Sequence, residues 1–253
     1  TEAVVEVFTS GSTGEPVSLV KSLRQLDAEV KVLEQVFGTG LRQDWKFHTT
    51  VSHQHLYGLL FCILWPLARG QAALASTIAY PEALLSAGDD YVLVSSPAFL
   101  KRLPTELAWP GPSHCQQVFS SGGPLPAQAA IDARNCLDAP VTEIYGSSET
   151  GGIARRSDPA AAWTVQPGVA IRLEDTGHLA VRSAFLPDAG WFVTADLARL
   201  SADGFVLQGR SDRIVKIEEK RISLTALQCH LEQHDGISEA RIVPLDGVRT
   251  LLA

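Results

Sequence analysis

The sequence has 253 residues, of which 45% are hydrophobic and 19% charged, and its formal net charge is −7. These proportions are typical of a folded chain with one substantial core, and they exclude the disordered and fibrous classes. The negative charge, together with the lack of a basic run with interleaved aromatic residues, argues against a nucleic-acid partner.

Predicted helices and strands alternate over the first 145 residues. Ser22 and Gln25 have the spacing of a capping box, and the helix that follows the cap is expected to end at Gly38 and Gly40. The remaining predicted strands are 3–8, 47–51, 91–95, 117–121 and 141–145, and the remaining predicted helices are 56–67, 98–103 and 127–136. Such alternation predicts an α/β fold with a parallel sheet flanked by helices.

Short alternating segments replace this pattern from about residue 165 onward. They lie at 170–173, 179–182, 191–193, 198–200 and 205–207, and they predict a small antiparallel β subdomain. A helix at 224–230 and a strand at 240–244 then predict the start of an α+β domain. We therefore expect three parts, which are residues 1–164, 165–211 and 212–253.

A loop of small residues follows the first predicted strand. Its sequence is Thr9-Ser10-Gly11-Ser12-Thr13-Gly14-Glu15-Pro16. Two glycines let successive N–H groups point the same way, and the hydroxyl groups add donors, so the loop suits a polyphosphate. It is not a GxxxxGK[ST] loop, and a flexible surface turn is the alternative interpretation.

This loop resembles the phosphate-binding loop of the AMP-forming adenylating superfamily. That superfamily contains acyl-CoA synthetases, luciferases and the adenylation domains of nonribosomal synthetases. The resemblance implies that residues 9–14 bind the phosphates of ATP. Val17 stands where the family usually has a lysine, and Lys21 is the nearest cation.

A second segment with glycines follows the last strand of the alternating region. It reads Tyr145-Gly146-Ser147-Ser148-Glu149-Thr150-Gly151. A carboxylate beside a glycine turn, at the carboxyl end of a strand, is well placed to hold Mg²⁺. A solvated loop glutamate is the alternative. The segment does not fit the GxSxG pattern of serine hydrolases, which excludes that class.

The same segment resembles the YGxTE motif of the superfamily, with Ser148 at the usual threonine position. The resemblance implies that Glu149 is the magnesium ligand and that Ser148 contacts the α-phosphate. It also implies that Tyr145 stacks on adenine beside Gly146. The preceding loop, with Ser121, Gly122 and Gly123, is expected to lie along the adenine.

Two later motifs resemble the ribose-binding and hinge motifs of the family. Residues 191–196 (WFVTAD) are similar to Y-x-T-G-D, which implies that Asp196 accepts hydrogen bonds from the ribose hydroxyls. Residues 209–216 (GRSDRIVK) are similar to GRxDxxxK, which implies that Arg210 binds the ribose and that Asp212 is the hinge of a mobile C-terminal domain. Glu219 replaces the glycine that the family has near its thiol tunnel.

Two histidines precede the apolar helix predicted at 56–67. His53 and His55 would need a third partner to hold a metal, and none is obvious from the sequence. The resemblance implies that His55 closes over the acyl site, and a helix-capping or core histidine is the alternative. The apolar helix and the Gly122 region are expected to line a pocket for an aromatic or aliphatic acid.

The four motifs occur in the family's order, and together they imply an ATP-dependent acid–thiol ligase. The resemblance implies attack of a carboxylate on ATP to form an acyl-adenylate. Transfer to the thiol of CoA, or to the phosphopantetheine of an acyl carrier protein, then follows. Segments TVSHQHLYGLLF and KIEEKRISL look similar to standalone ligases of aryl polyene pigment clusters.

Several features lead us to expect a fragment of a longer enzyme. The chain begins at Thr1 and contains no methionine. The family has a catalytic lysine near the end of its C-terminal domain, whereas this chain has no lysine after Lys220. A catalytically weak nucleotide-binding or interaction module is the alternative, favoured by Val17, by Glu219 and by Ala195, which stands where the family's ribose motif usually has glycine. We expect a cytoplasmic location without a membrane span, because the four cysteines are widely spaced and the longest apolar stretch is short.

Overall fold

The chain divides into two compact units. A computed structural model describes residues 3–10, 16–72, 76–86, 88–107, 109, 114–217, 220–234, 236–237 and 240–243. The first unit comprises Thr1–Ala170 and Val181–Phe192, and the second comprises Ile171–Ala180 and Val193–Ala253. The division into residues 1–164, 165–211 and 212–253 stays a prediction.

A mixed sheet forms the centre of the first unit. Its strand order is β3-β4-β5-β6-β7-β8. The bounds are β3 Lys46–Thr49, β4 Tyr91–Ser95, β5 Cys115–Ser120, β6 Val141–Ser147, β7 Gly151–Arg156 and β8 Thr164–Val165. Strands β3 to β6 are parallel, which confirms the predicted α/β class, and β7 and β8 add an antiparallel edge that the sequence patterns did not indicate.

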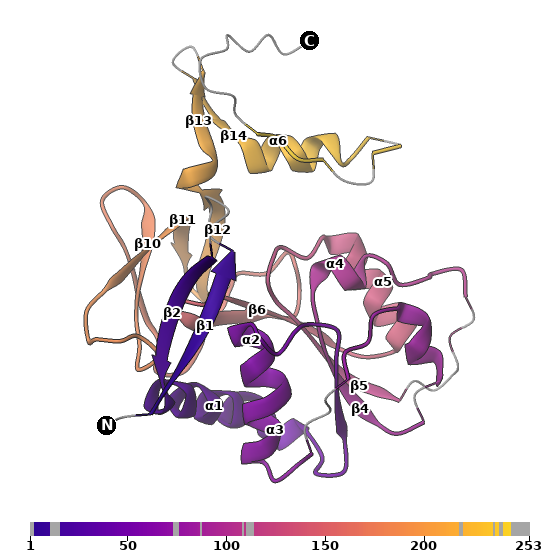
Figure 1. Ribbon diagram of the computed structural model, residues 1–253. Helices are drawn as coiled ribbons and strands as arrows, with labels where there is room; N and C mark the ends of the chain where they lie inside the picture. Colours follow the sequence, from indigo (N-terminus) through magenta and orange to yellow (C-terminus); the bar gives the residue numbers. More distant parts are fainter. Residues whose placement is uncertain are drawn as a thin grey trace. The chain divides into compact units, whose positions relative to one another are not determined.

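Helices cover both faces of this sheet (Figure 1). One face carries α1 Leu23–Phe37, α2 Leu56–Gly58, the π-helical segment η2 Leu59–Leu64 and α3 Trp65–Ala68. The other face carries α4 Pro97–Leu100 and α5 Ala127–Leu137. Two 3₁₀ turns, η1 Gly38–Gly40 and η3 Pro81–Ser86, complete the connections.

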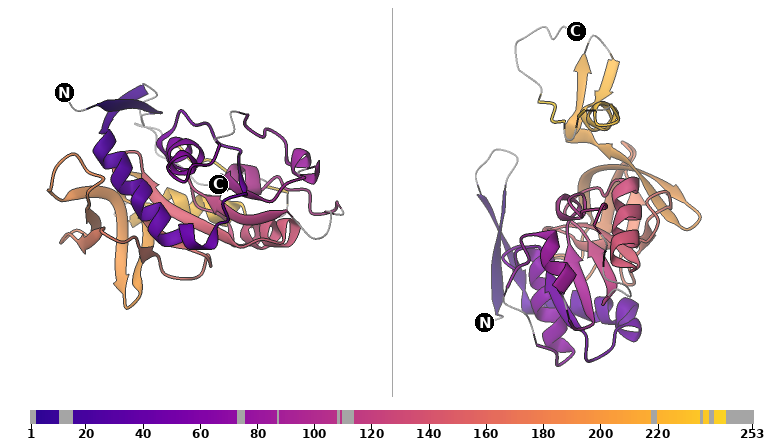
Figure 2. Two further views of the ribbon diagram at one scale, coloured as in Figure 1. Left: turned by 90° about the horizontal axis from the view of Figure 1, so that it is seen from below. Right: turned by 90° about the vertical axis from the view of Figure 1, so that its right-hand side faces the viewer.

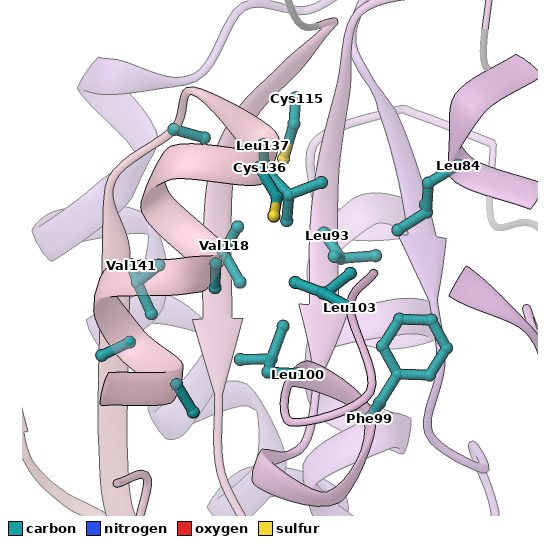
Figure 3. Close-up of a cluster of buried hydrophobic side chains, with 14 of the residues drawn as sticks. Leu84, Leu93, Phe99, Leu100, Leu103, Cys115, Val118, Cys136, Leu137 and Val141 are labelled. Atoms are coloured by element: carbon teal, nitrogen blue, oxygen red, sulfur yellow. The ribbon is translucent and has the colours of Figure 1, made fainter. Parts of the chain in front are cut away.

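Strand β4 shows why its sequence is apolar without a break. Tyr91 and Leu93 belong to the cluster that includes Leu100 and Val118. Figure 3 shows Leu93, Leu100 and Val118 between strands and helices. Val92 and Val94 belong to the cluster on the opposite face, beside Phe119 and Trp65. All five residues of β4 are buried, as expected for a central parallel strand covered on both faces.

Helix α1 begins where the capping box predicted it. The Gln25 N–H donates to Ser22 Oγ at 3.3 Å, and the Ser22 N–H donates to Gln25 Oε1 at 2.8 Å. Leu26, Val30 and Leu33 form its buried apolar stripe. This packing fixes the helix against the sheet face that also carries the candidate site.

A two-stranded ribbon precedes α1 (Figure 2). Strand β1, Val4–Ser10, pairs antiparallel with β2, Pro16–Ser22. The predicted first strand is therefore confirmed, but it belongs to this ribbon and not to the parallel sheet, and the sequence patterns did not indicate β2. Pairing with β1 continues through Ser22, so the last residue of β2 is also the N-cap of α1.

The predicted apolar helix at 56–67 is confirmed as one continuous helical run, but its centre is widened. The N–H of Trp65 donates to the carbonyl of Leu60, five residues earlier. Pro66 has no N–H and cannot form the usual bond to the carbonyl of Cys62, which favours such a local widening. Among the described residues, none of the helices is both long and apolar enough to cross a membrane.

The second unit is built mainly from antiparallel hairpins. A four-stranded sheet has the order β12-β11-β10-β9, and β13 pairs with β14. The bounds are β9 Ala170–Leu173, β10 His178–Arg182, β11 Phe192–Ser201, β12 Gly204–Arg210, η4 Ser211–Arg213, β13 Ile214–Ile217, β14 Lys220–Ser223 and α6 Leu224–Leu231. Segments 191–193 and 198–200, predicted as two strands, are joined in one strand, β11, which begins at Phe192. The strand predicted at 240–244 is wrong for residues 240–243, which have no regular structure.

Candidate active site

The carboxyl ends of two neighbouring parallel strands carry the predicted glycine segments. Strand β5 ends just before Ser121 and Gly122, and β6, its parallel neighbour, contains Gly146 near its end. Ser121 Oγ donates to the carbonyl of Ile144 at 2.9 Å and so ties one segment to the other. Gly122 has a φ of 92°, a conformation that favours glycine. Such an edge is where ligands bind in open α/β sheets.

A tight hairpin joins β6 to β7 and contains Glu149. The Ser147 N–H donates to Thr150 Oγ1 at 3.1 Å, and the Thr150 N–H donates to Ser147 Oγ at 3.3 Å. A Cβ on Gly146 would lie 2.2 Å from the carbonyl oxygen of Gly151. Only glycine therefore lets the two strands approach at this point, which explains the glycine in the motif.

A cavity of about 260 Å³ opens beside this hairpin. Its wall combines apolar side chains from the helical run 56–68 with the two glycine segments. The lining residues are Glu29, His55, Leu56, Tyr57, Leu60, Phe61, Ser121, Gly122, Ile144, Gly146, Ser147, Ser148, Gly151 and Gly152. All of them belong to the first unit.

Five residues singled out from the sequence meet in this cavity. They are His55, Ser121, Gly122, Gly146 and Ser148. His55 immediately precedes α2, and its carbonyl accepts from the Leu59 N–H at 2.8 Å. The roles that the resemblance implies for these residues stay predictions.

The other predicted site residues that the structure describes in the first unit do not line the cavity. Gly123 follows Gly122, and Glu149 lies in the turn between β6 and β7. The ring of Tyr145 lies 5.4 Å from that of Trp163, at an angle of 48°. Thr9 and Ser10 end strand β1. Gly11, Ser12, Thr13 and Gly14 lie outside the described residues.

The buried side chain of Lys21 bonds the backbone of Glu149. Its side chain is buried, and Nζ donates to the carbonyl of Glu149 at 2.7 Å and to that of Phe185 at 2.9 Å. Burial lowers the pKa of Lys21, while the nearby Glu29 and Glu149 carboxylates act against that shift. This cation is therefore engaged inside the first unit rather than presented to solvent.

Glu29 bonds the same hairpin at Gly152, three residues after Glu149. Its Oε1 accepts from the Gly152 N–H at 2.6 Å, and the residue is only 5% exposed. Burial raises the pKa of Glu29 to about 7, against the opposing effects of the Gly152 hydrogen bond and Lys21. Glu29 was not selected from the sequence. It could have been, because the helical spacing places Glu29 on the same buried face of α1 as Leu26, Val30 and Leu33.

The two predicted ribose ligands are neighbours in the second unit. Asp196 on β11 lies opposite Arg210 on β12 in the strand register, and Arg210 Nη1 lies 3.6 Å from Asp196 Oδ1. The Asp196 N–H donates to Thr194 Oγ1 at 3.1 Å, and Ser211 Oγ donates to the Ala195 carbonyl at 3.1 Å. These bonds fix the backbone on which the pair sits.

No all-protein metal centre is found in the described part of the chain. There, no group of three or more His, Cys, Asp and Glu side chains could hold a metal ion. A lone carboxylate such as Glu149 nevertheless suits Mg²⁺, which typically uses one or two carboxylates together with substrate phosphates.

The fold matches that of solved enzymes with bound nucleotides. ATP-bound MatB from Rhodopseudomonas palustris matches with a TM-score of 0.77 and 21% identity, over 92% of this chain and 53% of that one. The O-succinylbenzoate coenzyme A synthetase of Bacillus subtilis, in complex with AMP, matches with a TM-score of 0.78 and 19% identity, over 94% and 56%.

A family model decides the assignment. The model described as AMP-binding enzyme matches residues 2–179. The chain belongs to the AMP-binding enzyme family. That match includes both glycine segments and the whole cavity wall, whereas Asp196 and Arg210 lie beyond it. The predicted superfamily is thereby confirmed.

Curated relatives within the AMP-binding enzyme family are CoA ligases. The chain is 31% identical to a 4-coumarate–CoA ligase of Rhodobacter capsulatus, over 98% of this chain and 62% of that protein. It is 24% identical to a 4-hydroxybenzoate–CoA/benzoate–CoA ligase of Rhodopseudomonas palustris, over 97% and 52%. The chain thus spans between half and two thirds of the length of these relatives.

Proposed function

We propose that the protein carrying this chain activates a small carboxylic acid with ATP and then transfers the acyl group to a thiol. The observation that carries the proposal is the cavity at the carboxyl ends of β5 and β6, in a chain of the AMP-binding enzyme family. The acyl acceptor is CoA or the phosphopantetheine of a carrier protein. Membership of the aryl polyene subgroup and a cytoplasmic location stay predictions.

In the first half-reaction, the chain's residues orient the acid and the nucleotide. The substrate carboxylate attacks the α-phosphorus of ATP, and pyrophosphate leaves. Ser148 donates to the α-phosphate, Asp196 and Arg210 hold the ribose, and His55 closes the acyl site. Backbone N–H groups and hydroxyls of this kind stabilise the charge that develops as the bond breaks.

Glu149 is the residue that would hold Mg²⁺. The metal, when bound, offsets the charge of the phosphates. The protein's own contribution is to fix the Glu149 backbone, because Lys21 donates to its carbonyl and the Ser147–Thr150 hydrogen bonds close the turn around it. Because the turn is fixed in this way, its backbone needs little reorganisation when the nucleotide binds.

One structural observation favours a second candidate, a nucleotide-binding module with little turnover. Val17 replaces the family's usual lysine. The nearest cation in the sequence is Lys21, and its ammonium group donates hydrogen bonds to two backbone carbonyls. That arrangement leaves neither residue to grip the pyrophosphate.

Two measurements test the proposal and separate the candidates. Calorimetry with this chain should detect AMP and Mg-ATP, and Asp196→Asn should weaken both. Pyrophosphate release by the full-length protein, with a panel of small acids, should depend on Glu149, whereas Glu106→Gln, a change at an exposed glutamate, should leave it unaltered. Nucleotide binding without pyrophosphate release for any acid supports the second candidate, and no nucleotide binding contradicts both.

A further inference from the structure

The cavity wall combines apolar side chains with serines and glycines, and among the described residues it contains a single acidic group. Leu60, Phe61 and Ile144 supply apolar surface, and the rings of Tyr57 and Phe61 lie 4.8 Å apart. Glu29 is the one Asp or Glu in its lining. A volume of about 260 Å³ lies just below the roughly 300–1,000 Å³ typical of pockets for drug-sized ligands, so it favours a small acid.

The surrounding backbone holds the carboxyl group of Glu29 in this wall. Its Oε1 accepts from the Gly152 N–H at 2.6 Å, and Lys21 supplies compensating positive charge. A Cβ on Gly151 would lie 2.6 Å from Oε2, so glycine at that position is what makes room for the second oxygen. The two consecutive glycines therefore let a buried carboxyl group reach the cavity.

This carboxyl group still has hydrogen-bonding capacity to offer a ligand. A carboxylate has about four acceptor sites, and the Gly152 N–H uses one of them. Both the ionised and the neutral form can accept from a hydroxyl group. The ionised form also repels a second carboxylate, so the substrate's own carboxylate must lie at the other end of the cavity.

We propose that Glu29 determines specificity by accepting a hydrogen bond from a hydroxyl group at the end of the substrate remote from its carboxylate. The favoured substrate is thus a small aromatic acid with such a hydroxyl group. This inference rests on the proposed function, because it takes the cavity as the acid-binding site. A site that hydrogen-bonds a substrate hydroxyl discriminates strongly against the analogue that lacks it.

Calorimetry with three probe acids tests the proposal on the 253-residue chain, in the presence of AMP. The probes are 4-hydroxybenzoate, benzoate and the dicarboxylate terephthalate. We expect 4-hydroxybenzoate to bind about ten- to hundredfold more tightly than benzoate, since a hydrogen bond to a charged group has that effect on affinity. Terephthalate should bind most weakly.

Variants of Glu29 assign the preference to this residue. Glu29→Leu should abolish the preference for 4-hydroxybenzoate over benzoate, and Glu29→Gln, which still offers an acceptor oxygen to the Gly152 N–H, should keep part of that preference. Equal binding of the two acids by the unaltered chain overturns the inference even if no variant folds, and so does a preference that survives in Glu29→Leu. Loss of AMP binding would instead count against the proposed function.

Discussion

Replacement of Lys21 by methionine tests how the hairpin around Glu149 is held. Lys21 is only 2% exposed, and its ammonium group bonds the carbonyls of Glu149 and Phe185. Methionine fills a similar volume but donates no hydrogen bond. Lys21→Met therefore leaves two carbonyls without this donor and leaves the buried Glu29 without its compensating charge.

The expected loss in the free energy of unfolding is large. A hydrogen bond from a charged group contributes about 1.5–3 kcal/mol, and removing one partner of a buried pair costs about 3–5 kcal/mol. Since these terms overlap, we expect a total of about 3–5 kcal/mol for Lys21→Met. A domain is stable by only about 5–15 kcal/mol, so the variant should be severely weakened.

The loss should also depend on pH. Glu29 has a pKa of about 7 in the folded state, above its ordinary value of 4.5, so folding favours its neutral form and stability falls as pH rises from 4.5 to 7. Lys21 opposes that fall because it attracts the ionised form. At pH 5.5, where Glu29 is mostly neutral, Lys21→Met should therefore cost less than at pH 8.

Urea unfolding at both pH values, followed by tryptophan fluorescence, measures these differences. Lys31→Met is the matched control, because Lys31 pairs with Asp27 on the exposed side of α1 and such pairs contribute about 1 kcal/mol or less. The reasoning is refuted if Lys21→Met costs no more than Lys31→Met, or if its cost is as large at pH 5.5 as at pH 8.

Two further substitutions probe the same sheet edge. Gly146→Ala places a Cβ 2.2 Å from the Gly151 carbonyl oxygen, so it should separate β6 from β7, cost about 1–3 kcal/mol and weaken AMP binding, as thermal unfolding and calorimetry would reveal. Unchanged values for both would contradict this account of the glycine. Glu143→Gln leaves the Arg156 guanidinium, 2.7 Å from Glu143 Oε1, without its buried counter-charge and should cost about 3–5 kcal/mol in urea unfolding. Adding Arg156→Met to that variant should recover part of the loss, and a purely additive double variant would argue against a coupled pair.

Much of the fold could be predicted because its signals are local. The capping box at Ser22 placed α1, and the uninterrupted apolar run 91–95 placed a strand covered on both faces. Strands β2 and β7 were missed because each exists by pairing with a strand whose position the sequence does not state. Residues 240–243 include the β-branched pair Ile242 and Val243 but have no regular structure.

The candidate site divides in the same way. Gly122, Gly146 and Glu149 stand in short motifs after strands, so their neighbourhood could be predicted from the rule that parallel strands end at a common edge. Lys21 and Glu29 act on that edge across more than a hundred residues of sequence, since one bonds the backbone at 149 and the other at 152. No motif in the sequence marks either residue, and their role is recognised only because both side chains are buried in the structure.

The β6–β7 hairpin therefore links two parts of the proposed reaction. One side of it carries Ser148 and Glu149, which are expected to meet the nucleotide, and the other carries Gly151 and Gly152, which make room for Glu29 beside the acid pocket. Any change that shifts this hairpin should alter acid and nucleotide binding together. A change at Glu29 that leaves the hairpin in place should alter acid preference alone, and that contrast distinguishes a specificity role from a structural one.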